Sequence, residues 1–149
     1  YTPALDIKEP EIELAIINHL TKKGDKETKH HDGEKTFAAM RVYLLEEKEK
    51  DKLYNVYAWV LTGKFYPEDG EIKEDGGYSI PHSFTVESID GEFTVADSRI
   101  PRDGSYYPED MKDIFPDSVR KDMENVHTDG TVERLQSEIG QQAKLYFHQ

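Results

Sequence analysis

The segment Ile100-Pro101-Arg102-Asp103-Gly104-Ser105-Tyr106-Tyr107-Pro108-Glu109-Asp110 separates the strand-like part of this chain from its helical end. Two prolines and a glycine restrict the backbone here, and two adjacent tyrosines supply apolar surface. Pro108 suits the first turn of a helix, where its missing N–H costs no hydrogen bond. We therefore predict a specified corner, at which the chain passes from a sheet to C-terminal helices.

Four strand-like runs precede this corner. Strongly alternating or apolar patterns predict strands at residues 36–46, 53–65, 78–89 and 92–100. Asp90-Gly91 is typical of a two-residue type I′ hairpin turn, whereas residues 66–77 are predicted to be a long acidic loop. Because no helix separates the strands, we expect the sheet to be antiparallel.

Helices are predicted on both sides of the sheet in the sequence. Residues 9–23 place Ile12, Ile16 and Leu20 on one stripe, with Pro10 in the first turn. Residues 108–115, 116–125 and 131–147 form the helical end. The prediction is one α+β domain, residues 1–149: an N-terminal helix, a four-stranded antiparallel curved sheet and C-terminal helices. This order resembles cystatin-like and NTF2-like architectures.

Composition excludes several classes of partner. The net charge of −12 repels nucleic acid and anionic membrane surfaces. The chain has no cysteine, so disulfides and thiolate chemistry are absent, and no apolar run approaches the roughly 20 residues of a membrane span. We expect a soluble domain. Its first residue is Tyr1, which leaves room for a removed N-terminal segment that tethers it to a membrane.

One polar cluster is predicted on the second hairpin. A two-residue turn at Asp90-Gly91 pairs Val86 with Val95, and counting back places Asp97 opposite Phe84 and Arg99 opposite His82. His82, Asp97 and Arg99 would then share a face. Such a group binds an anion, performs acid–base chemistry, or forms a self-neutralised polar patch.

A second candidate surface lies on the first hairpin. If Glu46 faces Lys52, Ala38, Met40, Val42 and Leu44 form an aliphatic face with Tyr54, Val56, Ala58 and Val60. The other face holds Phe37, Arg41, Tyr43, Tyr57 and Trp59, with Arg41 opposite Tyr57 and beside Trp59. This aromatic face either lines a ligand groove or forms a core covered by the C-terminal helices.

Other motifs point to no chemistry. His30-His31-Asp32 has the residue types of a metal site, but adjacent residues of a strand face opposite ways, so a shared ion requires a loop geometry. We interpret this tripeptide as a solvated loop and expect no metal and no cofactor. No sequence signature marks a nucleophile, a zinc peptidase or a phosphate loop. Tyr106 belongs to the corner, which is either a purely structural turn over the sheet end or one wall of a pocket with His82 and Arg99.

Short motifs give a family resemblance. They are Val56-Tyr57-Ala58-Trp59-Val60, Ser79-Ile80-Pro81, Pro101-Arg102-Asp103-Gly104-Ser105-Tyr106-Tyr107 and Phe115-Pro116. This region, roughly residues 37–147, resembles the extracytoplasmic C-terminal domain of Gram-positive membrane metallopeptidases of the beta-lactam-sensor kind. It is also similar to stand-alone lipoproteins of Bacillus and Clostridium relatives. The peptidase zinc helix is absent, so the resemblance implies an exported, cell-envelope setting without protease activity.

The favoured interpretation is a non-enzymatic, extracytoplasmic ligand-binding or sensor-type domain of the Gram-positive envelope. Its partner would be a small molecule or an envelope protein. The candidate ligand residues are His82, Asp97, Arg99, Arg41, Tyr57, Trp59 and Tyr106. Two alternatives stay open: a small enzyme with an NTF2-like pocket that uses the His82/Asp97 pair as a base, and a structural protein-interaction domain with acidic helices as its contact face.

Overall fold

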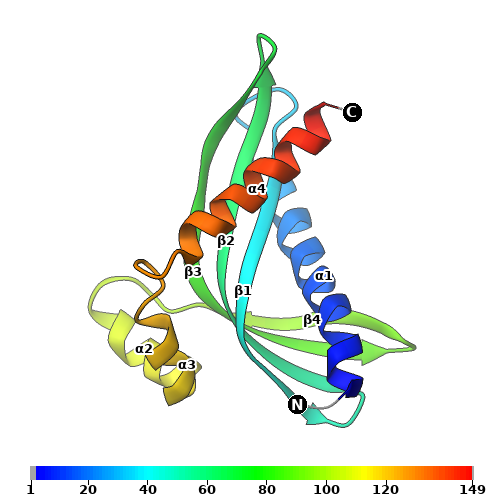
Figure 1. Ribbon diagram of the computed structural model, residues 1–149, viewed down its shortest axis with the longest axis vertical. Helices are drawn as coiled ribbons and strands as arrows, with labels where there is room; N and C mark the ends of the chain where they lie inside the picture. Colours follow the sequence, from blue (N-terminus) through cyan, green and yellow to red (C-terminus); the bar gives the residue numbers. More distant parts are fainter. Residues whose placement is uncertain (1–2, 149) are drawn as a thin grey trace.

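The computed structural model describes residues 3–148 and confirms the α+β architecture (Figure 1). The elements, in chain order, are α1 (Pro3–Asp25), β1 (Lys35–Glu49), β2 (Leu53–Glu68), β3 (Glu71–Ile89), β4 (Glu92–Arg99), the 3-10 turn η1 (Gly104–Tyr106), α2 (Tyr107–Ile114), α3 (Asp117–Met123) and α4 (Thr131–Phe147). The four strands form one curved antiparallel sheet in the order β1-β2-β3-β4.

Helices cover both faces of this sheet. On one face, Ile12, Ile16 and Leu20 of α1 pack against strand residues that include Val56 and Phe84. On the other, α4 crosses the long part of the sheet, while α2 and α3 lie side by side near its other end (Figure 1). The alternation of side chains along each strand feeds both cores, because successive residues point to opposite faces. We call these the α1 face and the α4 face.

The predicted loop at residues 66–77 is wrong. β2 continues to Glu68 and β3 begins at Glu71, so Asp69 and Gly70 form a second two-residue hairpin turn. Asp69 and Gly70 have φ values of 53° and 77°, close to the 51° and 82° of Asp90 and Gly91. Positive φ at both central residues is the type I′ requirement, which Asp-Gly satisfies at each turn.

A β-bulge changes the predicted register between β3 and β4. Val86 pairs with Val95 as predicted, but the ladder then shifts by one residue, so Asp97 pairs with Thr85 and Arg99 with Ser83. One extra residue in a strand moves every later side chain to the other face. Asp97 and Arg99 therefore lie on the face opposite to His82, and the predicted three-residue cluster does not form.

A second bulge lies in β1, between Val42 and Leu44. Beyond it Leu44 pairs with Tyr57 and packs on the α4 face, so its predicted place among the aliphatic residues is wrong. Before it Arg41 pairs with Trp59, not with Tyr57. The N-terminal helix also begins six residues earlier than predicted, which places Pro10 inside α1.

Candidate functional site

A hollow lies on the α1 face, where the C-terminal end of α1 meets the sheet. It has a volume of about 900 Å³ and is walled by α1, by the loop between α1 and β1, and by β2, β3 and β4. Leu20, Ile80 and Ile100 give it apolar walls, and Lys23 and Lys64 add cationic groups. The sequence predicts the strands that enclose this hollow. It does not predict the hollow itself.

His82 forms part of the cavity wall and is 6% exposed. Neither ring nitrogen has a hydrogen-bond partner among the described residues. Its ring stacks on Phe84, with ring centroids 4.9 Å apart, and on Tyr78 at 5.8 Å. Burial lowers the pKa of His82 to about 4, and the positive charges of Lys23 and His19 add to this shift. At neutral pH the ring is therefore uncharged and offers one donor and one acceptor.

A polar group gathers at the edge of the same cavity. His31 Nε2 and His30 Nδ1 lie 3.6 and 3.5 Å from Asp75 Oδ2. Glu34 is 4% exposed, and its Oε2 accepts a hydrogen bond from the His30 backbone N–H at 3.2 Å. Ligand atoms of His31, Glu34 and Asp75 all lie within 4.8 Å of one another. The structure thus groups His31 with Glu34 and Asp75, whereas Asp32, its neighbour in the tripeptide interpreted above as a solvated loop, is exposed.

Local backbone geometry positions this group. The Glu34 N–H donates to the His31 carbonyl in a tight turn that includes Gly33 at φ 75°. The His31 ring stacks on Tyr66, with centroids 3.8 Å apart and planes 5° apart. Asp75 lies in a bulge, where two residues of β3 face Lys64 alone on β2. Three sequence-distant segments therefore meet, and only the short spacing of His31 and Glu34 could be found in the sequence.

The aromatic candidates belong to the core on the α4 face. Tyr57 and Trp59 are 9% and 5% exposed, and Tyr57 packs its ring against Phe115 at 6.0 Å. Trp59 Nε1 donates to Ser79 Oγ at 2.9 Å, so its polar atom is satisfied. Of the two interpretations of this face, the structure has the filled core and not a groove.

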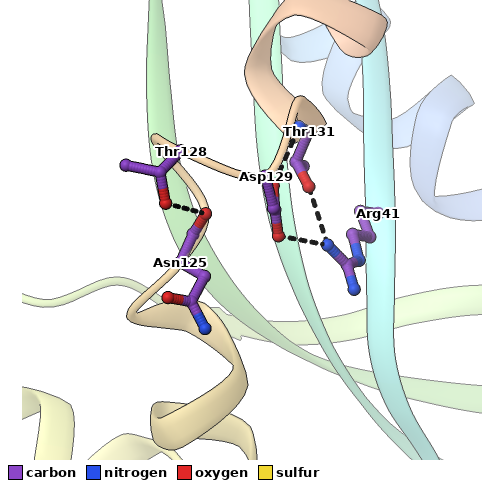
Figure 2. A network of polar contacts seen from close by, with 5 residues as sticks. All are labelled: Arg41, Asn125, Thr128, Asp129 and Thr131. Carbon is purple, nitrogen blue, oxygen red and sulfur yellow. Dashed lines mark hydrogen bonds and ion pairs between the residues drawn. The ribbon is translucent and has the colours of Figure 1, made fainter.

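Arg41 ties β1 to the start of α4. Its Nη1 donates to Asp129 Oδ2 at 2.9 Å and to Thr131 Oγ1 at 2.7 Å, and Asp129 Oδ1 accepts the Thr131 N–H at 2.9 Å (Figure 2). The Thr131 hydrogen bonds, with a smaller effect from Arg41, lower the pKa of Asp129. The guanidinium lies 4.5 Å from the ring centroid of Tyr43, which takes the cation–π place expected for Trp59. Arg41 also borders a shallow cleft of about 450 Å³.

The corner after β4 contributes only part of the cavity wall. Pro101 and Asp103 line the cavity. Tyr106, in contrast, is 53% exposed, and the Arg102 guanidinium lies over its ring, 4.0 Å from the ring centroid. Arg102 also makes a bidentate ion pair with Asp110, which lowers the pKa of Asp110 to about 2. The predicted pocket of Tyr106, His82 and Arg99 is therefore not formed, although the corner does border the cavity.

No protein-family model, curated protein or solved structure matches this chain. In the part of the chain that the structure describes, no helix is long and apolar enough to cross a membrane. The candidate site therefore stands on its own geometry: a cavity on the α1 face, a buried neutral histidine in its wall, and a group of histidine and carboxylate side chains at its edge.

Proposed function

We propose that this chain is a non-enzymatic ligand-binding or sensor-type domain, and that its ligand occupies the cavity on the α1 face. The observation that carries the proposal is His82, a polar side chain 6% exposed, in the wall of a cavity of about 900 Å³, without a described hydrogen-bond partner. Buried polar groups in folded proteins nearly always have partners. A ligand that supplies one removes the cost of leaving the imidazole unpaired.

The walls indicate the chemistry of this ligand. Leu20, Ile80 and Ile100 suit an apolar body, and neutral His82 suits a hydroxyl or another group that can both donate and accept. Burial and the nearby Lys23 and His19 disfavour a positive charge at this position. The ligand class is thus a small, largely apolar molecule that carries an uncharged hydrogen-bonding group.

Phenol is a suitable probe because it combines one apolar ring with one hydroxyl. In a titration followed by long-range 1H–15N spectra of the histidine rings, we expect saturable shifts of the His82 nitrogens, which the spectrum of His82→Phe assigns by their absence. Ser98 lines the cavity from β4, so Ser98→Trp should place an indole in it and weaken phenol binding and the shifts. Thr94→Trp, an exposed site on the same strand, serves as the matched control.

Unchanged His82 signals in the parent at saturating phenol would contradict the proposal. Equal loss of binding in Ser98→Trp and Thr94→Trp, with both variants folded, would place the effect outside the cavity. If His82→Phe keeps the cavity, it should still bind phenol, but about 2- to 10-fold more weakly, because it lacks one hydrogen bond.

The cell-envelope setting rests on the family resemblance of residues 37–147 and is part of the same proposal. Cystatin-like or NTF2-like architecture is likewise the proposed classification, supported by one helix packed on a curved four-stranded antiparallel sheet. Protease treatment of intact source cells tests the setting: an extracytoplasmic domain is digested, whereas an intracellular one stays intact until the cells are lysed.

The enzymatic alternative loses the pair on which it depended. The bulge after Thr85 places Asp97 on the opposite face from His82, and Asp97 is exposed. His82 therefore lacks the carboxylate expected to orient the imidazole and favour its protonated form. The interaction-domain alternative has its acidic surface, but no described contact singles out a docking face.

A further inference from the structure

The edge of the cavity carries a second kind of chemistry. We propose that His31, Glu34 and Asp75 bind a divalent transition-metal ion, with Zn²⁺ as the best match. Ligand atoms bound at about 2.05 Å in a tetrahedral site lie roughly 3.3 Å apart. His31 Nε2 and Asp75 Oδ2 are separated by 3.6 Å, and the whole group lies within 4.8 Å. Ion binding then requires the side chains to close the remaining difference, from at most 4.8 Å to about 3.3 Å.

The burial of Glu34 is an independent sign of a missing partner. Its side chain is 4% exposed, yet among the described residues no cationic side chain pairs with it. The carboxylate accepts a hydrogen bond from the backbone N–H of His30, which lies 3.2 Å from Oε2. Buried carboxylates are normally paired with a cation or bound to a metal. An ion held with His31 and Asp75 supplies that positive charge.

The ring of His31 is already oriented for ligation. It stacks on Tyr66 at 3.8 Å and directs Nε2 toward Asp75. This stack fixes the plane of the ring and so restricts the direction in which Nε2 points. The bulge of β3 opposite Lys64 positions Asp75 in this group. Without the bulge, regular strand pairing would place a different side chain there. Two segments, the turn of His31 and Glu34 and the bulge of β3, thus hold the three ligands close together before any ion binds.

The ligand types select the ion. One imidazole and two carboxylates suit Zn²⁺ and its first-row neighbours, whereas Ca²⁺ and Mg²⁺ prefer sites made of oxygen alone. Because Glu34 and Asp75 also line the cavity, an ion held by three protein atoms keeps a coordination position for water or for a ligand donor. The metal site does not depend on the phenol-type site at His82, and each can fail without the other.

Isothermal titration of the metal-free chain with Zn²⁺ at pH 7.5 tests this inference. We expect one ion per chain, and roughly 100-fold weaker binding after Glu34→Gln, Asp75→Asn or His31→Asn, since loss of a mere supporting group already costs about 10- to 100-fold. Asp32→Asn, an exposed neighbour in the same loop, should bind within about twofold of the parent. Ca²⁺ in tenfold excess over Zn²⁺ should not compete.

Thermal unfolding without metal separates lost ligation from lost folding. Glu34→Gln removes an unpaired buried charge, so its melting temperature should equal or exceed that of the parent while Zn²⁺ binding is lost. Full Zn²⁺ affinity in both Glu34→Gln and Asp75→Asn would overturn the proposal, and so would equal loss in Asp32→Asn or effective competition by Ca²⁺. Phenol titration of the same metal-free chain reports on His82 alone, so the two proposals are judged separately.

Discussion

Replacement of His82 by phenylalanine should change how the stability of the protein depends on pH. In the folded chain burial holds the pKa of His82 at about 4, against 6.5 for a free side chain. The folded state therefore resists protonation that the unfolded chain accepts. The resulting destabilisation of the fold is absent above pH 6.5, grows as the pH falls from 6.5 to 4, and is complete below pH 4. At about 1.4 kcal/mol per unit of pKa, the full destabilisation is about 3.5 kcal/mol.

Urea unfolding of the parent and of His82→Phe at pH 7.5 and pH 4.5 measures this effect. At pH 7.5 the variant should be as stable as the parent or more stable, because two buried unpaired nitrogens are replaced by carbon. At pH 4.5 its advantage should grow by about 2 to 3 kcal/mol. The same change at exposed His148 controls for the general effect of an added apolar ring.

Titration of the other groups is common to the parent and to His82→Phe, so it cancels in this comparison. His19 and Lys23 on α1 face the ring, and Tyr78 stacks on it; all three are kept in the variant. Parallel pH dependence of the two proteins would refute the reasoning, because it would mean that the imidazole is charged as easily in the folded state as in the unfolded state.

The remaining predictions use pairs of matched substitutions, each measured by urea unfolding. Leu135 is 0% exposed in the core on the α4 face, so Leu135→Ala should leave a cavity there and lower the free energy of unfolding by about 2 to 5 kcal/mol. Leu145 lies in the same helix but is 72% exposed, so Leu145→Ala should change the free energy of unfolding by less than about 0.5 kcal/mol. Gly24→Ala would place a Cβ 2.5 Å from the Thr36 side chain and should destabilise by about 1 to 3 kcal/mol, while Gly140→Ala meets nothing within 4 Å and should stabilise by about 0.5 to 1 kcal/mol. Equal effects within either pair would contradict the packing described above.

The sequence predicts the elements of this fold better than their registers. The Asp90-Gly91 turn, the apolar stripe of α1 and the start of α4 at Thr131 are local signals, and the structure confirms them. Asp69-Gly70 carries the same turn signal as Asp90-Gly91. Its acidic, proline-flanked surroundings favour a loop prediction, although a type I′ turn depends only on the two central residues.

Bulges explain why the predicted site residues did not come together. A register counted from Asp90-Gly91 is correct up to Val86 and wrong beyond it, and nothing in the sequence near Ala96 marks the extra residue. One such shift separates His82 from Asp97 and Arg99. The sequence predicts His82 as a ligand residue, and the structure places it in the cavity wall. The reasons to propose it as a ligand residue now are its burial and the lack of a described hydrogen-bond partner, which only the three-dimensional structure shows.

The group at the cavity edge shows the same limit of sequence reasoning. His31 and Glu34 are three residues apart in one turn, which is a local signal, but Asp75 joins them across the sheet through a bulge. Contacts between such distant segments depend on the tertiary fold, and the hydrophobic periodicity of the sequence does not predict them.

The central claim, that the cavity on the α1 face is the ligand site, is tested most directly by nuclear Overhauser effects between bound phenol and the methyl groups of the protein. The account predicts contacts from the phenol ring to Leu20 and Ile80, which line the cavity. Contacts to Leu135 and Ile139, in the core on the α4 face, would contradict it, as would saturable binding with no contact to the cavity methyls.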